Sequence, residues 1–194
     1  MRPIKIYGES KTGTTYLQHL LELNTNAEIL EGNEWSPLGW KHGFPQAGDA
    51  LYIFIFRDVY EWAKSLMADT VDRRFNGLQE KFGGTQYDFW NVWKNPIQCR
   101  IAKYYSYLGF AELNDTILVD LDYLRMLPNS IIRLLYGKYS YKYTGFKDIP
   151  THAYKNIEGR DNPDRKPLSK DQKAFIDSQI DQKLESFVHN LTIQ

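Results

Sequence analysis

The strongest constraint on the fold is an uninterrupted apolar run at residues 51–56, LYIFIF. A short run that is apolar on both faces is typical of a central strand in a parallel β-sheet, which helices cover on both sides. Directly after it, residues 59–67 place apolar side chains at the spacing of one helix face. The two segments together predict a strand followed by a helix, the repeating unit of a parallel α/β sheet.

The same patterns recur along the chain. Residues 3–7 (PIKIY) and 116–121 (TILVDL) predict two further strands. Helical spacing follows at residues 16–23 and again after Pro96, which suits the first position of a helix. We therefore expect a single domain over residues 1–194, built as a parallel β-sheet flanked by helices. Ligands of such sheets bind at the carboxyl ends of the strands.

A capping box marks the start of the last predicted helix. Ser169 and Gln172 have the spacing with which a side chain and the backbone cap each other at a helix N-terminus. Apolar residues continue at helical spacing from Ile176 to Phe187. The pattern predicts one continuous helix over this stretch.

Composition excludes several classes of protein. Lysine and arginine together number 24 and are balanced by 24 aspartates and glutamates, which argues against a non-specific nucleic-acid binder. Cys99 is the only cysteine, so the chain has no intrachain disulfide and no cysteine-based zinc site. No apolar run approaches the roughly 20 residues that span a bilayer. We expect a cytoplasmic protein with no membrane or nucleic-acid partner.

The turn after the first predicted strand has the glycine spacing of a phosphate-binding loop. Gly8 and Gly13 stand where the pattern GxxxxGK[ST] places its glycines, which let backbone N–H groups curl around an anion. Thr14 replaces the lysine that reaches the β- and γ-phosphates of a nucleoside triphosphate, and Lys11 stands inside the loop instead. The pattern predicts binding of one phosphate-like group. The alternative is an ordinary glycine- and threonine-rich turn with a solvent-exposed lysine.

The turn after the central strand carries a second candidate for anion binding. Arg57 follows the strand directly, and Ser65 lies eight residues later in the predicted helix. An arginine fork can hold a phosphate through two hydrogen bonds, and a serine hydroxyl can add another. The alternative is a surface arginine that pairs with Asp58 or Glu61.

Both turns resemble motifs of one enzyme family. Residues 11–16 (KTGTTY) resemble the Lys-Ser-Gly-Thr-Thr-Trp loop with which sulfotransferases dependent on 3'-phosphoadenosine-5'-phosphosulfate (PAPS) bind the 5'-phosphosulfate. Residues 57–65 (RDVYEWAKS) resemble the family's second motif, which holds the 3'-phosphate. Weaker similarities at residues 88–93, 117–124 and 168–177 follow in the family's order. The resemblance implies the sulfotransferase version of the P-loop nucleotide-binding-like α/β fold.

The resemblance also assigns residues to the bound nucleotide. Lys11 would stabilise the charge that develops on the leaving phosphate. The 5'-phosphate and the adenine would be held by the motif's later residues, Thr12, Gly13, Thr14, Thr15 and Tyr16. The 3'-phosphate would be held by the second motif and by a basic loop before the last helix, with Arg57, Ser65, Arg160 and Arg165 as candidates. The reaction in this family needs no metal ion.

A general base has to remove the proton of the acceptor, and three residues are candidates. Residues 40–45 (WKHGFP) loosely resemble the family's Lys-x-His-x-x-Pro context, so His42 is the first. Other branches of the family use glutamate, which keeps Glu34 and Glu9 as alternatives. His42 can also be a loop histidine that bonds to the backbone.

The function implied is transfer of a sulfuryl group from PAPS to a hydroxyl or amine of a small-molecule or carbohydrate acceptor, with 3',5'-ADP (PAP) as the product. Two alternatives remain open at this point. One is a P-loop kinase acting on a nucleoside or another small molecule. The other is a non-catalytic module that binds PAP or a related nucleotide. The sequence predicts neither the acceptor nor the oligomeric state.

Overall fold

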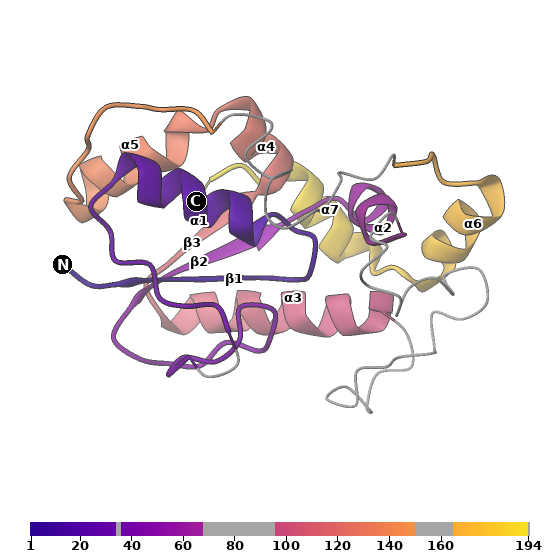
Figure 1. Ribbon diagram of the computed structural model, residues 1–194. Coiled ribbons are helices and arrows are strands. Elements are labelled where there is room, and N and C mark those ends of the chain that lie inside the picture. The colour runs from indigo at the N-terminus through magenta and orange to yellow at the C-terminus, as the bar shows by residue number, and fades with distance from the viewer. Residues whose placement is uncertain (34–35, 68–95, 150–164, 194) are drawn as a thin grey trace.

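The computed structural model describes residues 1–33, 36–67, 96–149 and 165–193 of the chain. Strands and helices alternate in the first part of the chain, and helices dominate the rest (Figure 1). In chain order the elements are β1 (Ile4–Gly8), α1 (Thr14–Asn24), β2 (Leu51–Phe56), α2 (Val59–Met67), α3 (Pro96–Leu113), β3 (Thr116–Asp120), α4 (Leu121–Met126), α5 (Asn129–Tyr139), α6 (Lys170–Gln179) and α7 (Gln182–Asn190).

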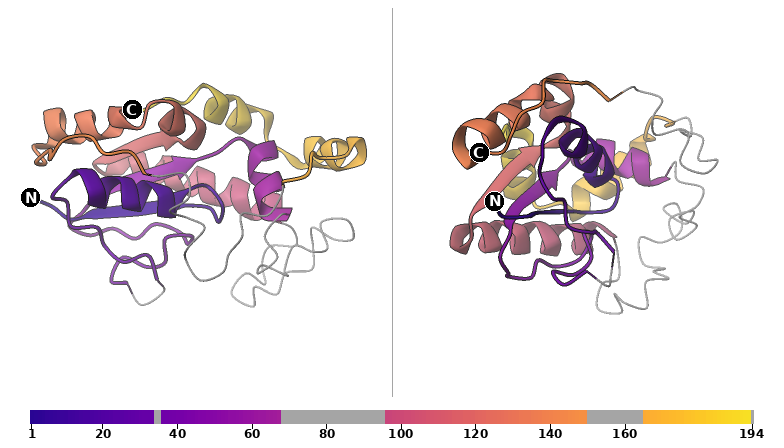
Figure 2. Two further views of the ribbon diagram at one scale, coloured as in Figure 1. Left: turned by 45° about the horizontal axis from the view of Figure 1, so that its top comes forward. Right: turned by 60° about the vertical axis from the view of Figure 1, so that its left-hand side comes forward.

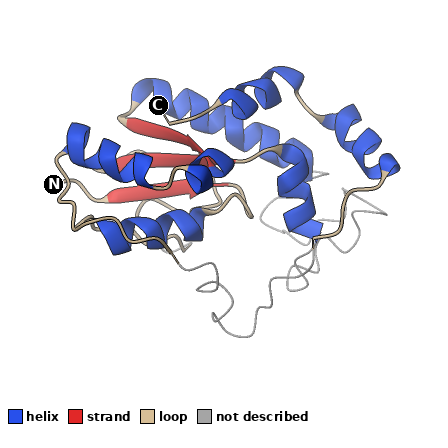
Figure 3. Cartoon of the chain, turned by 90° about the horizontal axis from the view of Figure 1, so that it is seen from above, coloured by secondary structure: helices blue, strands red, loops and turns tan. Residues whose placement is uncertain are grey.

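The three strands form one parallel sheet in the order β1-β2-β3 (Figure 3). Ile53 in the middle of β2 is the partner of Ile6 on one side and of Ile117 on the other. Every residue of β2 is buried, as the apolar run predicted for a central strand. All three predicted strands and the parallel α/β class are thus confirmed.

Helices cover both faces of the sheet (Figures 1 and 2). Alternate strand residues such as Ile6 and Ile53 pack in one cluster with the apolar sides of α1, α4 and α5. The residues between them, such as Tyr7 and Phe54, pack in a second cluster with α3 and α7. Successive strand side chains therefore point to opposite faces of the sheet and pack in two separate clusters. Within the described ranges, no helix has the length and apolarity needed to cross a membrane.

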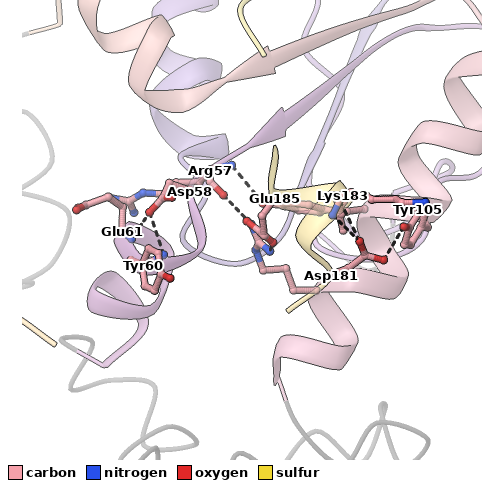
Figure 4. Close-up of polar contacts among 11 residues, drawn as sticks. Arg57, Asp58, Tyr60, Glu61, Tyr105, Asp181, Lys183 and Glu185 are labelled. Carbon is pink, nitrogen blue, oxygen red and sulfur yellow. Dashed lines mark hydrogen bonds and ion pairs between the residues drawn. The ribbon is translucent and has the colours of Figure 1, made fainter. Parts of the chain in front are cut away.

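The prediction of one continuous last helix is wrong. The capping box at Ser169 and Gln172 begins α6 as predicted, but α6 ends at Gln179 and α7 begins at Gln182. Between them Ile180 has an extended backbone, and the Asp181 side chain accepts hydrogen bonds from the backbone N–H groups of Lys183 and Leu184 (Figure 4). Apolar spacing continues across the break, so periodicity alone missed the new N-cap.

A fully buried arginine ties the helices of the second cluster to the end of β2. Arg100 of α3 pairs with Glu185 of α7, and its Nη2 atom lies 3.0 Å from Glu185 Oε2. The same nitrogen donates to the backbone carbonyl of Arg57, 2.8 Å away. The guanidinium lies 4.3 Å from the centre of the Tyr104 ring. These contacts fix the chain where the central strand ends.

We predict that Glu185→Ala lowers the free energy of unfolding by about 3–5 kcal/mol, because it leaves the buried Arg100 charge without its carboxylate. Urea denaturation measures this change. Asp115→Ala is the matched control, since it breaks an ion pair with Arg2 in which both side chains are 42% exposed. The control should cost less than about 1 kcal/mol. Similar losses for the two variants would contradict a structural role for the Arg100–Glu185 pair.

Candidate functional site

The loop between β1 and α1 folds on itself through local hydrogen bonds. The backbone N–H and the hydroxyl of Thr12 both donate to the carbonyl of Glu9, at 3.1 and 2.7 Å. Lys11 and Gly13 have φ angles of 70° and 90°, in the left-handed region. The loop is therefore a tight turn, and the buried Thr12 side chain stabilises it through its bond to Glu9.

Close packing explains both glycines of the predicted pattern. A Cβ atom on Gly8 would lie only 2.9 Å from the carbonyl oxygen of Ile55 in β2. A Cβ atom on Gly13 would lie 2.5 Å from a methyl group of Leu121, the first residue of α4. The loop is thus wedged between the central strand and the helix that follows β3. Its glycine spacing has a steric cause that the sequence could not show.

The N-terminus of α1 leaves backbone donors available for an anion. Gly13 is the N-cap and offers no side-chain cap, and the first bond of the helix runs from the N–H of Leu17 to the carbonyl of Gly13. The N–H groups of the first turn have no partner within the helix, and the helix dipole favours negative charge there. Thr14 is buried, whereas Thr15 and Tyr16 are half-buried.

Arg57 lies beside this loop and is only 1% exposed. Its Nη1 atom donates to the carbonyl of Lys11, 2.8 Å away, so the two predicted motifs are in direct contact. Its Nε atom is buried without a hydrogen-bond partner among the described residues. Burial, with a smaller contribution from the positive charges of Arg125 and Arg165, lowers the pKa of Arg57 to about 10.

The alternative of a surface arginine paired with a neighbouring acid does not hold. Asp58 caps α2 by accepting hydrogen bonds from the backbone of Tyr60 and Glu61 (Figure 4). The Glu61 carboxylate pairs with Lys64. Arg57 therefore has no carboxylate in hydrogen-bond contact within the part of the chain that the structure describes.

The charges of two further arginines act on Arg57, and one of these arginines was not predicted. Arg165, a predicted residue, keeps much of its surface exposed, and its partial burial and the charge of Arg125 lower its pKa. Arg125 lies in α4, with its guanidinium 3.6 Å from the carboxylate of Asp122. Sequence reasoning missed Arg125, although its place just after the third strand is a signal. Arg160, the other predicted residue of this region, lies outside the described residues.

Ser65 and Tyr16 lie near the two turns in different settings. Ser65 is half-buried in α2, and no hydrogen bond of its hydroxyl joins it to Arg57. Tyr16 packs against the cluster between the sheet and α1, α4 and α5. Burial raises the pKa of Tyr16, and the charge of Arg125 opposes this shift, which places that arginine near the start of α1.

His42 contacts the loop from a distant part of the sequence. Its Nδ1 atom lies 2.7 Å from the carbonyl oxygen of Gly8. Because a carbonyl only accepts, Nδ1 carries the proton in this contact and Nε2 is left as an acceptor. Burial, with smaller contributions from the charges of Lys41, Lys103 and Lys11, lowers the pKa of His42 to about 3 against the opposing effect of the Gly8 bond. The imidazole is therefore neutral.

Lys41, the neighbour of His42, is a second residue that sequence reasoning left unassigned. Its Nζ atom donates to the hydroxyl of Thr15, 3.2 Å away, so its charge lies at the first turn of α1. Its carbonyl accepts from the N–H of Gly8 at 2.9 Å, which fixes the loop of residues 36–43 against the end of β1. Burial lowers the pKa of Lys41.

Of the two glutamates predicted as alternative bases, the structure describes only Glu9. Glu9 is almost fully buried, and its Oε2 atom lies 2.5 Å from Nζ of Lys103 in an ion pair. Its other oxygen accepts from the N–H of Ser10. Glu9 thus pairs the β1–α1 loop with Lys103 of α3. Glu34 lies outside the described residues.

The arrangement brings the β1–α1 loop, a buried arginine and a neutral histidine together at the carboxyl ends of β1 and β2. Among the residues that the structure describes, no group of three or more His, Cys, Asp and Glu side chains is placed to hold a metal ion. Comparison with protein-family models, with curated protein sequences and with solved structures found no match to this chain.

Proposed function

We propose that this protein is a sulfotransferase that uses PAPS as the sulfuryl donor and acts on a hydroxyl or amine of a small-molecule or carbohydrate acceptor. The observation that carries the proposal is the contact between the two turns. The guanidinium of Arg57 bonds to the Lys11 carbonyl, and its buried Nε lacks a partner among the described residues. A buried cation beside an anion-binding loop calls for a ligand with more than one negative group.

A nucleotide with phosphates at both 3' and 5' positions suits two adjacent sites. β1 and β2 are neighbours in the sheet, and Gly8 is the register partner of Ile55, so their following turns lie side by side. The 5'-phosphosulfate would bind at the N-terminus of α1, near Lys11 and Lys41. The 3'-phosphate would bind to Arg57, with Arg165 adding positive charge. We also propose that the chain has the sulfotransferase version of the α/β fold.

In the proposed reaction the acceptor oxygen or nitrogen attacks sulfur while the bond from sulfur to the phosphate oxygen breaks. PAP leaves with the electron pair of that bond, and Lys11 stabilises the growing charge, as fixed positive groups do in phosphoryl transfer. The acceptor proton passes to Nε2 of His42, which is unprotonated when Nδ1 donates to Gly8. Placement of the two reactants would supply much of the rate.

One alternative has a specific observation in its favour. The low pKa of His42 makes it a weak base in the ligand-free protein, which suits a non-catalytic module that binds PAP. Binding of the donor can raise this low pKa, because three lysines, Lys41, Lys103 and Lys11, contribute to it. Negative charge bound between Lys11 and Lys41 would offset their repulsion and raise the pKa of His42. A kinase is less suited, because Thr14 stands where its phosphate-binding lysine belongs.

We predict that PAP raises the melting temperature in the absence of any metal ion, because only the folded chain presents both turns together. At 100 times the dissociation constant, the stabilisation is about 2.7 kcal/mol. Differential scanning fluorimetry with PAP, and with ATP and magnesium in parallel, provides the measurement. A larger shift with ATP and magnesium would favour a kinase over the sulfotransferase.

We predict that saturating PAP raises the pKa of His42 by about one to two units, the scale of a charge at about 6 Å in a protein environment. Titration of the imidazole resonances by NMR, with and without PAP, measures the shift, and His42→Gln identifies the signal. If His42 is the base, the same variant lowers turnover of PAPS by about 100-fold or more while PAP still binds. Normal turnover of His42→Gln would show that another group removes the proton.

A further inference from the structure

Two side chains, Arg57 before α2 and Trp62 within it, donate hydrogen bonds to two successive carbonyl groups of the β1–α1 loop. Nη1 of Arg57 donates to the carbonyl of Lys11 at 2.8 Å, and Nε1 of Trp62 donates to the carbonyl of Ser10 at 2.9 Å. Both donor side chains are buried, with 1% exposure each. The backbone of Arg57 is fixed in turn by Arg100 and by the hydroxyl of Tyr104. The two donors are thus rigidly placed.

These bonds help to determine the shape of the loop. In a trans peptide the C=O and N–H point in opposite directions, so a held carbonyl also fixes the direction of the following N–H. The bond to the Ser10 carbonyl thus fixes the N–H of Lys11, and the bond to the Lys11 carbonyl fixes the N–H of Thr12, which closes the turn by donating to Glu9. Lys11 has a φ of 70°, a conformation that residues with a Cβ atom rarely adopt. A conformation of this kind persists where surrounding contacts hold it. The bonds from Arg57 and Trp62 supply such contacts.

We infer that Arg57 is a positioning residue for the loop as well as a ligand of the second anion, so that the two anion sites are coupled. The inference rests on the proposed function for the identity of the ligands. Nη1 holds the Lys11 carbonyl, while Nε is directed at no described acceptor and remains for the 3'-phosphate. A nucleotide without a 3'-phosphate therefore also depends on Arg57, although it never contacts this side chain.

Substitutions that separate charge from hydrogen bonding test the inference, with 5'-AMP as the probe. Arg57→Lys keeps the charge but loses the planar fork that can serve the loop and a ligand at once. It should weaken 5'-AMP binding by about 10-fold, the scale of one hydrogen bond from a charged donor. Arg125→Ala removes a nearby charge that has no bond to the loop, and should weaken binding by less than about 3-fold. Isothermal titration calorimetry measures both affinities.

Amide hydrogen exchange in the ligand-free protein supplies a second readout. Arg57→Lys should speed exchange across residues 8–15, whereas Arg125→Ala should leave it as in the wild type. Trp62→Phe removes the bond to the Ser10 carbonyl and keeps an aromatic ring beside Arg100, so it should act in the same direction as Arg57→Lys. It also keeps the test decisive if Arg57→Lys folds poorly.

The outcomes distinguish this inference from the proposed function. If the wild type binds PAP but Arg57→Lys binds 5'-AMP normally, or if the loop exchanges as in the wild type, the inference is wrong and the sulfotransferase proposal stands. If Arg125→Ala loses more affinity than Arg57→Lys, charge alone explains the effect and the inference is again wrong. If the wild type binds neither PAP nor 5'-AMP, the proposed function fails, and the exchange of residues 8–15 in Arg57→Lys and Trp62→Phe decides the positioning role by itself.

Discussion

Two buried arginines lie where the central strand ends, and among the described residues only Arg100 has a carboxylate partner. Arg100 pairs with Glu185, whereas Arg57 meets a backbone carbonyl and the charges of Arg125 and Arg165. Removing an unpaired charge from water is costly unless an opposite charge or several hydrogen bonds compensate. The chain keeps this charge at the edge of the sheet where ligands of parallel α/β proteins bind. An anionic ligand gives the burial of Arg57 a physical reason.

Three lysines act on the histidine beside the β1–α1 loop. Lys11, Lys41 and Lys103 all lower the pKa of His42, and Lys103 also pairs with Glu9. In the proposed function a phosphosulfate binds beside Lys11 and Lys41. Its negative charge would make His42 a stronger base, which would link donor binding to the chemistry. Before the donor binds, the low pKa of His42 would keep its imidazole neutral and ready to accept the acceptor's proton.

Much of the fold could be predicted from the sequence, because its elements are local patterns. The apolar run of β2, the alternation of strands and helices, and the capping box of α6 all depend on neighbouring residues. The break before α7 was missed because the apolar spacing carries on through Ile180 to Leu184, and Asp181 was not recognised as a cap. The sequence placed the two candidate turns directly after the first and the central strand, and the structure shows that these strands are neighbours in the sheet.

The properties of the site could not be predicted, because they arise between distant segments. Nothing in the local sequence shows that Arg57 bonds to the Lys11 carbonyl, 46 residues away. The low pKa of His42 depends on lysines from three parts of the chain, and the burial of Glu9 depends on Lys103 of α3. Arg125 lies outside both motifs, so only the fold places it near Arg57.

We propose that one nucleotide contacts both turns through its two phosphates. A crystal structure of the protein with PAP would show whether it does. We expect the 5'-phosphate at the N–H groups of Gly13 to Thr15 and the 3'-phosphate within hydrogen-bond distance of Nε of Arg57, with Nη1 still bound to the Lys11 carbonyl. PAP bound elsewhere, or bound with its 3'-phosphate away from Arg57, would contradict it.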